Sequence, residues 1–152
     1  MIDAGFNNAD CIKALQGVDI KGTRNFVHPG HTVYDGQMHG MNVLSCIATN
    51  RPGALVGTAP EASFYLLVSE DDSTEHKVEE DYWCAAVEYA DSVGCDVVTS
   101  SLGYAGFDDP AEVLATTSWM AARTSTAGWP HWQPRAAWCC STAPETAEKS
   151  RW

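Results

Sequence analysis

Two short runs, the apolar residues 62–69 and the residues 96–102 with their Val-Val pair, constrain the fold of this chain most strongly. Neither run alternates polar and apolar residues in the manner of a half-exposed strand, so both predict strands buried on both faces, as in a parallel sheet. Between them, residues 79–93 carry apolar side chains at helical spacing, and Gly94 supplies a C-cap. The order strand, helix, strand predicts an α/β fold with a parallel sheet flanked by helices.

The alternation continues toward the N-terminus. Residues 38–49 predict a second helix, ended by the Asn-Arg-Pro-Gly of residues 50–53. Residues 8–15 predict a short helix, residues 17–26 a connection with a short strand, and residues 28–37 a loop. The apolar side chains of the second helix share one face: Val43, Leu44, Ile47 and Ala48.

Three residues sit at the carboxyl ends of predicted strands: Asp3, Ser69 and Gly103. The first of them comes after an apolar pair, Met-Ile, which is typical of the last residues of a buried strand entering a loop. We therefore expect the chain to begin inside a larger domain. Active sites of parallel α/β sheets lie beyond the carboxyl ends of the strands, so these three positions predict where a site would form.

Composition changes sharply near residue 112. Residues 1–112 contain 18 acidic and 5 basic residues, whereas residues 113–152 contain 2 acidic and 4 basic residues. Five of the six tryptophans also lie in the second part: Trp119, Trp129, Trp132, Trp138 and Trp152. A single domain seldom changes composition so abruptly, so we interpret the two parts separately.

Charge, hydropathy and cysteine spacing argue against several functions. The net charge of −11 disfavours nucleic-acid binding, which depends on Lys and Arg at phosphates. No apolar run approaches the roughly 18 residues of a membrane-spanning helix, and no signal peptide is visible. The absence of a Cys-x-x-Cys pair gives little support to a zinc or thioredoxin-like site. Apolar surroundings predict that Cys46, Cys84 and Cys95 are small core residues.

Asp3 and His39 form the most informative pair of chemical groups. Asp3 follows a predicted strand, and His39 opens a predicted helix 36 residues later. An aspartate that accepts the Nδ1 hydrogen of a histidine fixes the ring tautomer and stabilises the imidazolium formed on proton uptake. Each residue also has a simpler interpretation by itself, as a turn residue for Asp3 and a surface residue for His39.

Four segments, in order, resemble motifs of the subtilisin-like serine proteases. Residues 2–5 (Ile-Asp-Ala-Gly) resemble Asp-Ser/Thr-Gly, and residues 39–48 (His-Gly-Met-Asn-Val-Leu-Ser-Cys-Ile-Ala) resemble His-Gly-Thr-x-Val-x-Gly-x-Ile-Ala. Residues 56–62 (Val-Gly-Thr-Ala-Pro-Glu-Ala) resemble the turn Gly-Val-Ala-Pro-x-Ala, and residues 97–103 (Val-Val-Thr-Ser-Ser-Leu-Gly) resemble the substrate-lining strand Val-x-Asn-x-Ser-Leu-Gly. Three departures lie beside the proton-transfer groups rather than at them: Ala4, Met41 and Ser45.

The resemblance implies that residues 1–112 are the N-terminal part of a subtilase catalytic domain, with a partial three-layer subtilisin-like fold. It implies a serine-type endopeptidase in which Asp3 is the orienting acid and His39 the general base. An extended polypeptide substrate would pair with the backbone by strand addition at three residues: Ser101, Leu102 and Gly103. We expect no cofactor and no metal site, and the family implies an extracytoplasmic or secreted location.

The nucleophilic serine motif of the family, Gly-Thr-Ser-x-Ala-x-Pro, and its oxyanion asparagine have no counterpart in the chain. A shifted reading frame would explain these absences. Synonymous codons for residues 137–146, read from the third nucleotide, can encode Met-Val-Leu-Leu-Asn-Ser-Ala-Gly-Asn, which resembles the oxyanion strand. We therefore interpret residues 113–152 as a frameshifted, poorly ordered tail. We expect an inactive fragment that lacks the C-terminal part of its catalytic domain.

Two other functions remain open. One is a non-catalytic peptide-binding or scaffold module that uses the edge at residues 101–103. The other is a metal protein, although His-x-x-His is a weak spacing and a solvated loop is the simpler interpretation; its ligands would be His28, His31 and His39. Residues 70–72 (Glu-Asp-Asp) lack the ordered spacing of a calcium loop and predict a solvated loop. The acidic residues 79–81 predict a helix N-terminus favoured by the helix dipole.

Overall fold

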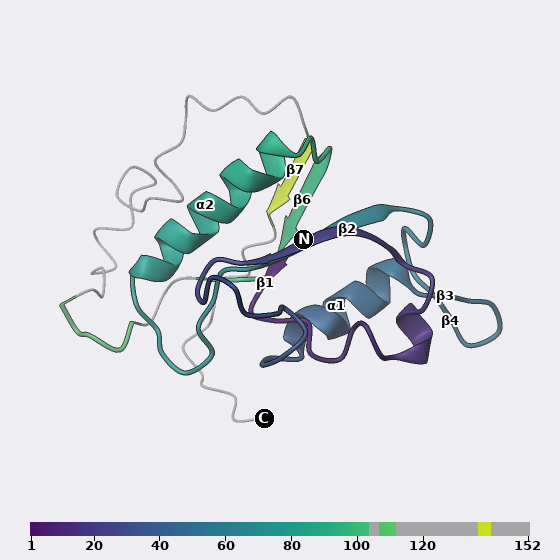
Figure 1. The fold of residues 1–152 in the computed structure, drawn as a ribbon, viewed down its shortest axis with the longest axis horizontal. Helices are drawn as coiled ribbons and strands as arrows, with labels where there is room; N and C mark the ends of the chain where they lie inside the picture. The colour runs from purple at the N-terminus through teal and green to yellow at the C-terminus, as the bar shows by residue number, and fades with distance from the viewer. Residues whose placement is uncertain (104–106, 112–136, 141–152) are drawn as a thin grey trace.

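A computed structural model describes residues 1–103, 107–111 and 137–140 of the chain. Its main feature is a five-stranded sheet with the strand order β2-β5-β1-β6-β7, in which every neighbouring pair is parallel (Figure 1). The predicted α/β fold with a parallel sheet is confirmed. The strands are β1 (Ile2–Asp3), β2 (Asp19–Asn25), β5 (Ser63–Val68), β6 (Val97–Ser100) and β7 (Ala137–Cys140).

Two helices cover opposite faces of this sheet, α1 (His39–Ala48) and α2 (Val78–Ser92) (Figure 1). The alternation of side chains along β5 produces the two layers. Phe64, Leu66 and Val68 pack in one cluster with Leu44 and Ala48 of α1. Leu67 and Tyr65 point the other way, into a cluster that contains three residues of α2: Ala86, Val87 and Ala90. The central strands are therefore buried on both faces, as their apolar sequence predicts.

Both helices start and end within one residue of their predicted limits. In α1 the predicted apolar face is the buried one, because Leu44 and Ala48 are fully buried while Val43 and Ile47 pack against them. After α2, Gly94 has a φ of +78°, the left-handed conformation that ends a helix at little cost when the residue is glycine.

The smaller elements differ from the predictions. Residues 8–15 form turns and only a short 3-10 helix, η1 (Lys13–Leu15). Residues 50–53 do end α1, but they also open an antiparallel hairpin of β3 (Asn50–Arg51) and β4 (Leu55–Val56). Two-residue strands carry too little apolar pattern to be detected from sequence.

The cysteine prediction is wrong at one position. Cys46 is exposed, whereas Cys84 and Cys95 are half-buried. Cys46 lies two residues from both Leu44 and Ala48 on α1, a separation of about 200° around a helix, so it faces away from the core. Four cysteines are free thiols: Cys11, Cys46, Cys84 and Cys95.

In the C-terminal part, residues 137–140 form β7, which pairs with β6 from Val97↔Ala137 to Ser100↔Cys140. These four residues thus belong to the sheet, unlike the poorly ordered tail that the sequence predicts. The remainder of the predicted tail, beyond its four strand residues, lies outside the described part of the chain. Across the described residues, no helix has the length and hydropathy needed to cross a membrane.

Candidate active site

The site lies at the carboxyl ends of the central strands. In the sheet, Ile2 pairs with Leu67 of β5 and with Ser100 of β6, and Asp3 pairs with Val68. The end of β1 is therefore flanked by the ends of β5 and β6. This is the edge at which active sites of parallel sheets form, and the sequence predicted the same edge.

Asp3 and His39 meet at this edge, as predicted. His39 is the first residue of α1, and its Nδ1 lies 2.8 Å from Asp3 Oδ1. The same oxygen accepts a hydrogen bond of 2.8 Å from the backbone N–H of Ala4. The Asp3 side chain is fully buried, whereas 50% of the His39 side chain is exposed. A buried acid thus orients a ring whose other nitrogen, Nε2, is left for proton exchange.

Burial controls the ionisation of Asp3. Removal of the carboxyl group from water raises its pKa above the ordinary value, and the hydrogen bond and charge of His39 act in the opposite direction. Asp3 Oδ2 is buried and has no hydrogen-bond partner among the described residues. His39 is the main group that stabilises the Asp3 charge, followed by the N–H of Ala4 and the N-terminal ammonium group.

Two glycines make the close approach of these groups possible. A side-chain carbon at Gly40 would lie 2.8 Å from Asp3 Cβ and 2.5 Å from the carbonyl oxygen of Gly5. A side-chain carbon at Gly5 would lie 2.6 Å from the carbonyl oxygen of Gln37. Contacts this short are excluded for ordinary side chains. The glycines of the Asp-x-Gly and His-Gly motifs thus let the start of α1 pack directly on the end of β1.

Residues 101–103 continue the chain just beyond β6. Ser101 and Leu102 are half-buried, and Gly103 is exposed. Leu102 packs against the cluster beneath α2. Among the described residues, the pairing of β6 with β7 ends at Ser100 and Cys140, and residues 101–103 follow on the side of Asp3.

A hollow of about 220 Å³ adjoins the pair and is lined in part by Ala4 and Gln37. Its titratable lining residues are His28, His31, Asp35, Glu70, Asp71 and Asp72. The rings of His28 and His31 lie 5.5 Å apart, centroid to centroid. Together with His39, however, they do not form a group of converging metal ligands in the described part of the chain. The geometry therefore does not support the three-histidine metal site.

The acidic start of α2 was only partly anticipated. Glu79, Glu80 and Asp81 do occupy the first turn of the helix, as predicted. Glu79 and Glu80 are nevertheless buried, each only 1% exposed, and Glu79 lies near two other glutamates, Glu70 and Glu75. A glutamate at a helix start is compatible with solvent exposure, so the local sequence contains no signal for this burial.

Comparison with known proteins adds no assignment. No protein-family model matches the chain, and no curated protein matches it. The functional interpretation therefore depends on the residues and their geometry.

Proposed function

We propose that the described α/β unit is part of the catalytic domain of a subtilisin-like serine endopeptidase. The observation that carries the proposal is the 2.8 Å contact between His39 Nδ1 and the buried Asp3 Oδ1. Its support is the combination of this contact with the position of Asp3 at the end of a central parallel strand and with the two motif glycines packed around it. A surface histidine with an incidental carboxylate neighbour would require neither the burial nor the glycines.

In this proposal His39 acts as general base and then as general acid. Its Nε2 takes the proton of a serine hydroxyl as the oxygen attacks the peptide carbonyl, and Asp3 stabilises the resulting imidazolium. The proton then passes to the leaving amine as the peptide C–N bond breaks, which leaves an acyl-enzyme. Water then attacks the ester of the acyl-enzyme while His39 takes its proton, and His39 returns that proton to the serine oxygen as the acyl group leaves. The serine and the oxyanion donor belong to segments that this sequence does not contain.

The substrate is an extended polypeptide that pairs with the backbone at residues 101–103. The support for this is their position after β6, next to the end of β1 and beyond the β6–β7 pairing of the described residues. Strand addition supplies main-chain hydrogen bonds that do not depend on the substrate sequence. The polypeptide class, rather than one cleavage specificity, is therefore the substrate we propose.

The serine protease proposal predicts that the 152-residue chain is inactive and that a protein extended through the shifted reading frame is active. A fluorophosphonate probe should give no adduct with the 152-residue chain, because no activated serine is present. The DNA that encodes residues 113–152, read in the frame shifted by one base, should lead into a downstream segment that encodes Gly-Thr-Ser-x-Ala-x-Pro. A protein extended through that frame should be labelled at this serine, and labelling should be lost in His39→Ala.

Three outcomes would contradict the proposal. The shifted frame could lack the serine motif, the extended protein could remain unlabelled, or labelling could survive His39→Ala. Binding of unstructured peptides that persists in His39→Ala, without any labelling, would instead favour the peptide-binding module. The exposed His31 provides the matched control, since His31→Ala should leave labelling unchanged.

A further inference from the structure

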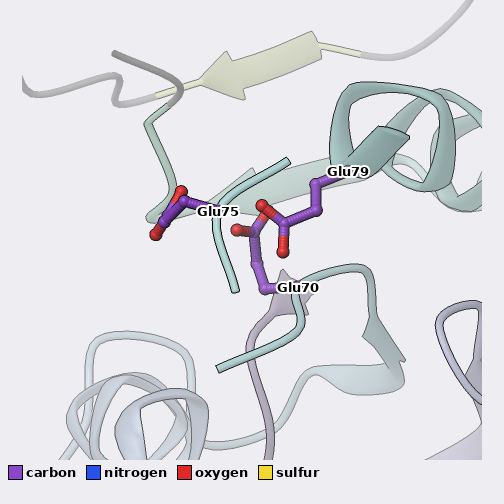
Figure 2. A group of neighbouring side chains, drawn as sticks. All are labelled: Glu70, Glu75 and Glu79. Carbon is purple, nitrogen blue, oxygen red and sulfur yellow. The ribbon is translucent and has the colours of Figure 1, made fainter. Parts of the chain in front are cut away.

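Three glutamates converge at the start of α2, on the opposite face of the sheet from α1. Glu70 follows β5, Glu75 lies in the connecting loop, and Glu79 is in the first turn of α2. One carboxylate oxygen from each lies within 4.8 Å of the others. In Figure 2 the carboxyl groups of Glu70 and Glu79 face one another, and Glu75 lies to one side of this pair, on the neighbouring loop. Like charges at these distances repel strongly unless something neutralises them.

The surroundings of Glu79 indicate what kind of group could neutralise this charge. Its side chain is only 1% exposed. Its Oε1 accepts a hydrogen bond of 2.8 Å from the backbone N–H of Asp71, but its buried Oε2 has no partner among the described residues. A buried carboxylate oxygen without a partner costs free energy. The carboxyl group that carries it faces that of Glu70 (Figure 2). The cluster therefore combines concentrated negative charge with a buried, unused ligand atom.

We propose that Glu70, Glu75 and Glu79 bind a calcium ion. All three donors are carboxylate oxygens, which suit hard cations, whereas zinc prefers nitrogen and sulfur. Ca²⁺ takes several carboxylate ligands in a flexible geometry, and the ligand atoms of the three glutamates already lie within 4.8 Å of one another. Mg²⁺ requires near-ideal octahedral geometry, keeps several waters and is usually bound by only one or two carboxylates.

Calcium at this position would connect three segments of the chain. Glu70 belongs to the end of β5, and Glu79 belongs to α2. The backbone N–H of Glu75 donates to Asp108 Oδ2 at 3.0 Å, and its carbonyl accepts from the N–H of Asp108 at 2.8 Å. The ion would thus hold the loop between β5 and α2 together with the segment that follows residues 101–103. The calcium site is independent of the proposed proteolysis and goes beyond it.

Calorimetric titration of the full 152-residue chain with calcium chloride, after treatment with EDTA, tests the site. We expect one Ca²⁺ per chain and weaker binding of Mg²⁺. Glu79→Gln and Glu75→Gln should each lower the calcium affinity at least about tenfold, since loss of a group that only supports a metal ligand already costs 10- to 100-fold. Glu88→Gln is the matched control, because Glu88 is an exposed glutamate on the same helix.

The exposed Glu75 keeps the test decisive even if Glu79→Gln fails to fold, which circular dichroism would show. Three results would overturn the proposal. They are no saturable binding at millimolar calcium, calcium binding that Glu75→Gln leaves unchanged, and Mg²⁺ binding as tight as that of Ca²⁺. In the first case the cluster would be neutralised by a proton instead of a metal ion.

Discussion

Asp3 and Glu79 are two buried carboxylates near the carboxyl ends of neighbouring strands, and they differ in their neighbours. Asp3 is fully buried and Glu79 is 1% exposed, so burial raises the pKa of both groups. Beside Asp3 lies the imidazole of His39, whereas beside Glu79 lie the carboxylates of Glu70 and Glu75. The same degree of burial therefore accompanies two different proposed roles, support of proton transfer for Asp3 and cation binding for Glu79.

The largest effect that separates the two acids is expected in catalysis. In the protein extended through the shifted frame, Asp3→Asn should lower kcat about 10⁴-fold, because the amide no longer holds His39 in the reactive tautomer. Steady-state kinetics on a peptide substrate would measure this. The control Glu88→Gln should leave kcat unchanged. A loss of less than about tenfold in Asp3→Asn would show that Asp3 is a structural residue only.

The packing around Asp3 is the next test of the comparison. Alanine normally stabilises a helix relative to glycine by about 1 kcal/mol. At position 40 we expect the opposite, a loss of about 1–3 kcal/mol in the free energy of unfolding, because the added carbon would press on Asp3 Cβ and on the Gly5 carbonyl. Urea denaturation would measure it. The control is Asn42→Ala, at an exposed position of the same helix. A Gly40→Ala substitution that stabilises the protein would contradict the close packing.

The pH dependence of stability tests the environment of Glu79. Its pKa in the folded protein is raised, chiefly by burial, so the folded state binds this proton more tightly than the unfolded state does. The resulting stabilisation is fully present below the ordinary pKa of 4.5 and is lost as the pH rises through the folded value. In EDTA, the difference in unfolding free energy between the wild type and Glu79→Gln should follow this course.

The difference in unfolding free energy between the wild type and Glu79→Gln removes the contributions of the other titratable groups. The buried amino group of Met1 is one of these, since burial lowers its pKa to about 6 and makes its contribution fall with decreasing pH. Added calcium should reverse the trend of the difference, because protons and the cation compete for the same carboxylates. A difference that does not change with pH would show that Glu79 is solvated as an ordinary glutamate.

The smallest expected effect is on the titration of Asp3. His39 is the main group that lowers the Asp3 pKa, so His39→Ala should raise this pKa further above its ordinary value. The ¹³C chemical shift of the labelled Asp3 carboxyl group, followed against pH, would measure the change. The His31→Ala variant should titrate like the wild type. A lower Asp3 pKa in His39→Ala would mean that the pair does not interact as described.

The predictability of this fold depended on the length of each element. Residues 62–69 and 79–93 show enough apolar periodicity for β5 and α2 to be located, and the observed limits lie within one residue. The β3–β4 hairpin was missed because each strand has two residues. Cys46 was misassigned because its apolar neighbours were considered without the helical angle that separates it from Leu44.

The sequence by itself determined the order of strands and helices, since apolar periodicity is a local property, and it identified Asp3 and His39 through their motifs. Only the tertiary structure decided how those residues are used. Burial depends on segments distant in the chain that come to cover a side chain. The packing of α1 on β1 buries Asp3 against a base, and the packing of α2 beside the end of β5 buries Glu79 among acids.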